Sequence, residues 1–139
     1  MMDKYIKSLI LAVALLLFMA SNTVYSAQKD VLLQTTSTWD NAHYKKLKIK
    51  NPEVTVLKIN IGVGESLPMH KHDLVNIAYV KHGTLTVITD KDDQITLTEG
   101  QCLPELVGKY HYGKNTGDVP VELVVFYIGE KGTPLSVNK

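Results

Sequence analysis

Short runs of alternating apolar and polar residues, separated by turn residues, occupy positions 52–128 and constrain the fold more than any other feature. This period of two is typical of half-buried β-strands, and no window after residue 27 combines a period of 3.6 with helix caps. The pattern predicts an all-β sandwich or barrel, in which closure into a barrel or jelly roll would also cover the strand edges. The predicted strands are Val54–Ile61, Val75–Lys81, Thr84–Thr89, Ile95–Thr98 and Val121–Ile128.

The first 27 residues have the organisation of a secretory signal peptide. Lys4 and Lys7 precede an unbroken apolar run, Leu9–Ala20, and small residues at Ser26 and Ala27 provide a cleavage site. A membrane-spanning helix needs about 20 apolar residues, so the shorter run disfavours the alternative of a transmembrane anchor. We therefore expect residues 1–27 to be removed and the protein to be exported, periplasmic or extracellular, with no stable membrane anchor.

The remaining chain divides by composition and residue pattern into an N-terminal arm and one domain. Residues 28–51 are polar and rich in lysine, and we interpret them as an N-terminal arm with one short strand around Lys45–Ile49. Residues 52–139 form the expected barrel, a single domain whose size supports one modest hydrophobic core. Gly129–Lys139 is expected to be a tail.

Composition excludes several partners. Removal of residues 1–27 takes two lysines and one aspartate, which leaves equal numbers of basic and acidic side chains. Nothing in this balance favours nucleic acid or an anionic membrane. The chain has no arginine, so a ligand's carboxylate would be bound by lysine, a metal or backbone amides. Cys102 is the only cysteine and cannot form an internal disulfide; we expect it to be buried, with a thiol near a site or an intermolecular link as alternatives.

His70 and His72 form the most informative pair of side chains. In a β-strand, residues two apart point to the same face, so both imidazoles would face one point while Lys71 points away. Neutral imidazole is a good ligand for zinc, copper, iron and nickel. The pair alone is a weak signal, because alternation by itself places histidines two apart on one face.

Flanking residues strengthen this signal, since together they form two spaced motifs. The first motif contains Gly64, His70, His72, Asn76 and Gly83, and the second contains Gly100, Leu106, Gly108, His111 and Asn115. These motifs resemble the two-motif signature of the cupin superfamily, in particular its small single-domain, quercetin-dioxygenase-like members. Two positions depart from the signature: Asn76 stands where glutamate is expected, and Leu106 where proline is expected. The resemblance covers about Val54–Ile128.

The resemblance implies a jelly-roll barrel (a double-stranded β-helix) with one divalent transition metal at its mouth, bound by His70, His72 and His111. The glycines suit turns with a positive φ. Asn76 offers only a neutral amide oxygen at the fourth ligand position, so three imidazoles would favour zinc, copper, nickel or iron over manganese. Two nearby carboxylates, those of Asp73 and Glu105, are candidates to replace the missing glutamate.

Three functions follow as expectations. The first is a metal-dependent exported enzyme that acts on a small molecule, with catalytic residues that the sequence does not identify. The second is a non-catalytic module that binds a metal or a small molecule, and the third is a barrel with a degenerate, empty site. By analogy with the family, a homodimer is expected. The other histidines and the nearby tyrosines are expected at the surface or in packing roles: His43, His82, Tyr79, Tyr110 and Tyr112.

Overall fold

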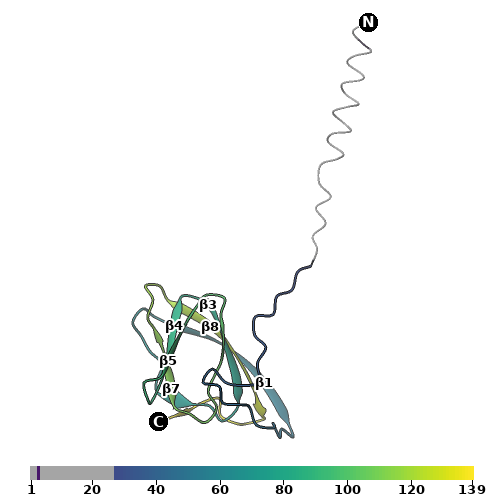
Figure 1. Ribbon diagram of the computed structural model, residues 1–139, viewed down its shortest axis with the longest axis vertical. Coiled ribbons are helices and arrows are strands. Elements are labelled where there is room, and N and C mark those ends of the chain that lie inside the picture. Colours follow the sequence, from purple (N-terminus) through teal and green to yellow (C-terminus); the bar gives the residue numbers. More distant parts are fainter. Residues whose placement is uncertain (1–2, 4–26) are drawn as a thin grey trace. The chain divides into compact units, whose positions relative to one another are not determined.

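The computed structural model describes Asp3 and residues 27–139, so the predicted signal peptide lies, except for Asp3 and Ala27, outside the described residues. Val31–Lys139 form one compact unit that contains every strand described below (Figure 1). Among the described residues, no helix is long and apolar enough to cross a membrane. The strands are β1 Pro52–Ile61, β2 His70–Lys71, β3 Val75–His82, β4 Thr84–Thr89, β5 Gln94–Thr98, β6 Cys102–Pro104, β7 His111–Asn115, β8 Val121–Glu130 and β9 Val137–Asn138.

The strands pair antiparallel in two sheets. One sheet has the order β1-β8-β3-β6, and the other has the order β5-β4-β7-β2-β9. The chain crosses between the sheets repeatedly, because β1, β3, β6 and β8 belong to the first and β2, β4, β7 and β9 to the second. This architecture confirms the all-β jelly roll that the alternating runs and the spaced motifs predicted.

The hydrophobic core lies between the two sheets. Along β8, Val121, Leu123, Val125 and Tyr127 are buried, and the residues between them are half-buried or exposed. The period of two therefore decides which side chains enter the core. Other strands follow the same alternation, and the cluster includes Ile61, Ala78, Val80, Leu85, Val87, Leu97 and Leu103.

The expected strand at Lys45–Ile49 is wrong. These residues pair with no strand, and the arm's only ladder contact among the described residues is an isolated bridge between Ser37 and His43. The Glu130 carboxylate instead accepts hydrogen bonds from the backbone N–H groups of Lys50 and Asn51, at 2.7 and 3.0 Å. The arm is thus attached to the barrel by side-chain contacts and by isolated backbone hydrogen bonds, such as that from Trp39 N–H to Pro104 O at 3.0 Å, and not by addition of a strand.

Gly83, between β3 and β4, is required by both its conformation and its surroundings. Its φ is +84°, and a Cβ atom there would lie 2.9 Å from the carbonyl oxygen of Pro120. An L-residue would be strained and would also collide with the neighbouring backbone. Gly64, Gly100 and Gly108 have positive φ angles too, as the motif interpretation expected.

Candidate metal centre

Four side chains of the types that bind metal ions converge inside the barrel. One ligand atom from each of His70, His72, Glu105 and His111 lies within 4.8 Å of all the others. His70 of β2 and His111 of β7 are direct antiparallel partners, so their side chains share a face, and His72 lies two residues beyond His70. The three ring centroids are 4.8, 4.9 and 5.2 Å apart. Pairing of two short strands therefore builds the cluster.

Each of the three imidazoles is held by a backbone carbonyl. Nδ1 of His70 donates to Pro68 O at 2.7 Å, Nδ1 of His72 to Leu135 O at 2.6 Å, and Nδ1 of His111 to Lys109 O at 2.9 Å. A carbonyl oxygen only accepts, so the proton of each neutral ring is on Nδ1. The unprotonated Nε2 atoms then remain available to a metal, the outer-shell arrangement typical of histidine metal sites.

Glu105 brings a negative charge to the three rings. Its Oε2 lies 3.1 Å from Nε2 of His72 and 3.1 Å from Nε2 of His111, and its side chain is only 12% exposed. Burial raises the pKa of this carboxyl, but the hydrogen bond and charge of His111 and His72 outweigh burial and lower the pKa to about 2. Glu105 is therefore an anion at neutral pH.

This donor set requires a cation. If all three rings are neutral, the Nε2 lone pairs of His72 and His111 face a carboxylate that can only accept. Nε2 of His72 is buried, and the Glu105 oxygen 3.1 Å away accepts a hydrogen bond from it only when this nitrogen carries a proton. A proton on a ring or a metal ion at the centre removes this repulsion, and three imidazoles with one carboxylate suit a divalent transition metal.

The register explains how Glu105 comes to replace the glutamate missing at Asn76. Ile77 of β3 pairs with Pro104 of β6, so the next pair along this register is Asn76 and Glu105. The N–H of Glu105 donates to Asn76 O at 3.1 Å. Residues directly opposite in antiparallel strands point to one face, so the carboxylate enters the barrel from the adjacent strand. The amide of Asn76 itself is buried with neither its oxygen nor its nitrogen hydrogen-bonded.

The expectation of a purely neutral three-histidine face is corrected by this geometry. Of the two candidate carboxylates, Glu105 joins the cluster, whereas Asp73 is half-exposed and pairs with Lys71 Nζ at 3.1 Å. Spacing along the chain did not distinguish the two, because the β3–β6 register that selects Glu105 is a tertiary feature. Manganese is no longer disfavoured, since its exclusion depended on the absence of a carboxylate among the donors.

The space beside the cluster is small and mostly apolar. A cavity of about 30 Å³ is lined by the four donor side chains, by Tyr127, and by aliphatic residues of both sheets. That volume corresponds to about one water molecule. The ring of Tyr127 lies 5.7 Å from that of His72, and burial, with a smaller contribution from the Glu105 charge, raises the pKa of Tyr127 to about 12. The phenol is therefore neutral and is not a base at neutral pH.

A larger groove lies outside the donor cluster. It has a volume of about 510 Å³ between the arm residues 42–49 and the barrel, and none of the four donors lines it. Its walls include Asp73, the residue directly after His72. They also include Val107 and Gly108, which are two and three residues after Glu105.

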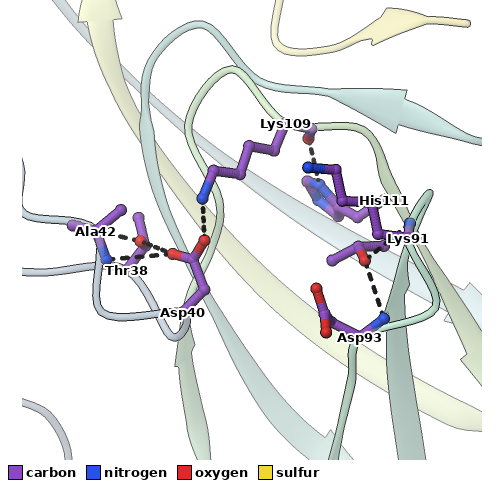
Figure 2. A network of polar contacts seen from close by, with 8 residues as sticks. Thr38, Asp40, Ala42, Lys91, Asp93, Lys109 and His111 are labelled. Carbon is purple, nitrogen blue, oxygen red and sulfur yellow. Dashed lines mark hydrogen bonds and ion pairs between the residues drawn. The ribbon is translucent and has the colours of Figure 1, made fainter.

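Figure 2 shows how the arm is connected to Lys109, the residue whose carbonyl holds the imidazole of His111. Nζ of Lys109 contacts the carboxylate of Asp40, which also accepts a hydrogen bond from Thr38, while the carbonyl of Lys109 accepts the proton of His111 Nδ1. Burial opposes the ionisation of Asp40, but the ion pair with Lys109 and the other hydrogen bonds lower its pKa. The arm thus constrains the residue that orients one of the four candidate ligands.

The remaining candidates lie away from the cluster. His43 and His82 are exposed, as expected, and His82 Nδ1 lies 2.9 Å from Glu99 Oε2. None of the three tyrosines expected to pack, Tyr79, Tyr110 and Tyr112, lines the small cavity. The expected burial of Cys102 is wrong: it is half-buried, because it alternates with the buried Leu103 and therefore faces outward on edge strand β6. Asn115 serves the fold, since its amide nitrogen donates to the carbonyls of Ile61 and Val119.

Comparison with known proteins identifies the fold family. Residues 57–127 match the family model described as "Cupin domain". A search of curated proteins gave no match. Among solved structures, BH2720 from Bacillus halodurans is similar, with 22% identity and a TM-score of 0.53 over 61% of this chain and 68% of that one.

Two similar structures belong to enzymes. The DMSP lyase DddQ from Ruegeria pomeroyi DSS-3 has 20% identity and a TM-score of 0.54, over 62% of this chain and 43% of that one. The polyketide cyclase RemF from Streptomyces resistomycificus has 17% identity and a TM-score of 0.53, over 63% of this chain and 61% of that one. The matches thus span less than two thirds of either enzyme, and at these identities they establish a shared fold.

Proposed function

The chain belongs to the cupin family, and on that premise we propose that it is an exported protein that binds one divalent transition metal ion through His70, His72, His111 and Glu105. The observation that carries this proposal is the convergence of the four ligand atoms within 4.8 Å, with all three Nδ1 atoms held by carbonyls. Export rests on the signal-peptide pattern of residues 1–27.

The protein's own residues would set the properties of the centre. A bound ion would act as a Lewis acid toward a small ligand or an inner-sphere water. Glu105 lowers the net charge of the site by one and so reduces the cost of holding a dication in an apolar barrel. Tyr127 and the surrounding aliphatic side chains restrict the amount of water beside the ion. Iron, zinc, copper and nickel remain candidates, and Glu105 adds manganese to them.

The size of the cavity bears on whether the protein only binds a metal ion or also converts a small molecule. A cavity of about 30 Å³ leaves little room beside the four donors, which favours metal binding as the primary function. A second candidate, metal-dependent turnover of a small molecule, is supported by His70, which is only half-buried and so leaves one side of the cluster near the surface. An organic substrate would then have to meet the ion from that side.

Metal content of the tag-free protein tests the proposal. We expect about one equivalent of a transition metal after reconstitution and dialysis, and the double variant His70→Ala/His111→Ala should abolish retention because only two of the four donors remain. The matched control is His82→Ala, which removes an exposed histidine that also contacts a glutamate. Less than about 0.1 equivalent in the wild-type protein, for every metal tried, would overturn the proposal.

A further inference from the structure

The groove between the arm and the barrel has the size of a small-molecule site. Its volume is about 510 Å³, one wall consists of arm residues 42–49, and the other includes barrel residues 73–75, 107–108 and 128–130. We name it the arm groove. None of the four donors of the candidate metal centre lines it, so an inference about this groove is independent of metal binding.

The walls of the arm groove are mainly aliphatic. Three large apolar side chains are exposed there: Leu47 by 54%, Ile128 by 44% and Val107 by 39%. Apolar side chains that are exposed together in one concave site indicate a ligand with an apolar part. The aliphatic members of the walls offer contacts to an alkyl chain; they include Leu47, Ile49, Leu74, Val75, Val107 and Ile128.

The arm also supplies positive charge to the groove. Lys45, Lys46 and Lys48 line it, and none of them forms an ion pair with another described residue. The chain has no arginine, so an anion here meets single ammonium groups and no bidentate guanidinium. Charge-assisted hydrogen bonds from such ammonium groups suit a simple carboxylate.

The acidic side chains of the groove do not neutralise these lysines, because they already have other partners. Asp73 contacts Lys71 Nζ at 3.1 Å, and the Glu130 carboxylate accepts backbone N–H groups of Lys50 and Asn51 at 2.7 and 3.0 Å. The charge of the arm lysines therefore remains available to an anionic ligand.

Tyr44 adds a hydrogen-bond donor. It lines the arm groove, and its hydroxyl group is buried with no hydrogen-bond partner among the described residues. Burial, with a smaller contribution from the charge of Glu105, raises the pKa of Tyr44, so the phenol keeps its proton at neutral pH. A ligand oxygen that reaches this hydroxyl group would accept that proton in a hydrogen bond.

We propose that the arm groove binds one free aliphatic carboxylate of medium chain length. The alkyl chain contacts the apolar walls, and the carboxylate is bound by the arm lysines. Apolar walls alone would suit a neutral lipid, and lysines alone would suit any small anion, whereas the two together select an amphipathic anion. The groove has walls on both the arm and the barrel, so it holds a single chain and not a membrane surface.

Isothermal titration of the intact protein with dodecanoate, below its critical micelle concentration, tests the proposal. We expect saturable binding of one equivalent. Dodecyltrimethylammonium, which has the chain without the negative charge, and acetate, which has the charge without the chain, should each bind at least about tenfold more weakly. Equal affinity for the cationic amphiphile would refute the proposal. Absence of saturable dodecanoate binding would refute it too, and would favour a protein segment as the occupant of the groove.

A substitution in the apolar wall tests the site of the alkyl chain. Leu47→Glu places a negative charge beside the ligand and should lower dodecanoate affinity by about tenfold or more. The matched control is Leu32→Glu, which changes another exposed leucine of the arm, 63% exposed and outside the groove. Both leucines are exposed, so neither substitution disturbs the core. Equal affinities of the two variants would contradict the proposed site.

Removal of the arm lysines tests the site of the carboxylate. The triple variant Lys45→Gln/Lys46→Gln/Lys48→Gln should bind dodecanoate about tenfold more weakly and should lose its preference over the cationic amphiphile. The control removes the same charge from three exposed lysines outside the groove: Lys29, Lys91 and Lys114. An arm variant that binds dodecanoate as tightly as the wild-type protein would overturn the proposal.

Discussion

Glu105 is the residue on which the chemistry of the barrel interior depends. Without it, three neutral imidazoles would meet at a point, and their preference among metals would follow from nitrogen ligands alone. With it, the site has an anion whose Oε2 is 3.1 Å from two of the three Nε2 atoms. The motif position for the glutamate is taken by Asn76, and the carboxylate comes from Glu105, which follows β6 directly and lies opposite Asn76.

Moving the carboxylate from position 105 to position 76 tests whether the two positions can both reach the ion. Glu105→Gln should lower metal affinity by about 10- to 100-fold, because it removes the only anionic donor of the described cluster. Adding Asn76→Glu to that variant should recover much of the loss, since side chains directly opposite share a face. Affinity is measured by competition with a chromophoric chelator, and Glu99→Gln is the control. A double variant as weak as Glu105→Gln would show that position 76 does not reach the ion.

The metal-free protein should show a bell-shaped contribution of Glu105 to stability. The lowered pKa of Glu105, about 2, stabilises the fold above the ordinary value of 4.5, and this contribution is lost as pH falls toward 2. For His72, burial alone would lower the pKa, but the Glu105 hydrogen bond and charge raise it, so its contribution is complete below 6.5 and is lost as pH rises further.

Urea unfolding of metal-free wild-type protein and Glu105→Gln checks this prediction. We expect the difference in free energy of unfolding to be largest between pH 4.5 and 6.5, on the order of 2–3 kcal/mol, and to shrink at pH 3 and at pH 9. A difference that does not vary over this range would mean that no ion pair forms between Glu105 and His72.

At the scale of the strands, the shortest elements position the cluster. β2 has two residues, yet it pairs with β7 on one side and with β9 on the other. Gly129–Lys139 was expected to be a tail, but its first two residues end β8, and the rest places Leu135 O against His72 Nδ1 and adds β9 to the sheet. A strand of two residues shows no period in the sequence, which is why neither β2 nor β9 was predicted.

Deletion of residues 134–139 tests the role of this C-terminal segment. The deletion removes β9 and the carbonyl that orients His72, so metal affinity should fall by about 10- to 100-fold while the circular dichroism spectrum stays that of a β-protein. The control is Lys139→Ala, which removes the ion pair with Asp90 but retains β9. Unchanged affinity after the deletion would show that His72 needs no support from Leu135.

At the scale of the molecule, the strands follow from the local sequence pattern, whereas the complete set of four donors follows from tertiary geometry. Thr84–Thr89 was predicted with its observed bounds, because alternation and flanking turns are properties of adjacent residues. The three histidines were identified because they occupy fixed positions within two spaced sequence motifs. Glu105 could not be chosen over Asp73, since the β3–β6 register decides it, and Cys102 was misplaced because its residue type favours burial while its strand parity exposes it.

X-ray absorption spectroscopy of the zinc-loaded protein tests the central claim most directly, because it counts the ligands of the ion. We predict a four-coordinate shell at about 2.0–2.2 Å that contains one carboxylate oxygen, with the outer-shell scattering of three imidazoles. Loss of the oxygen ligand in Glu105→Gln should leave the three imidazoles in place. A wild-type spectrum with one imidazole or none, or a shell of oxygen ligands only, would contradict the claim that His70, His72, His111 and Glu105 form a metal centre.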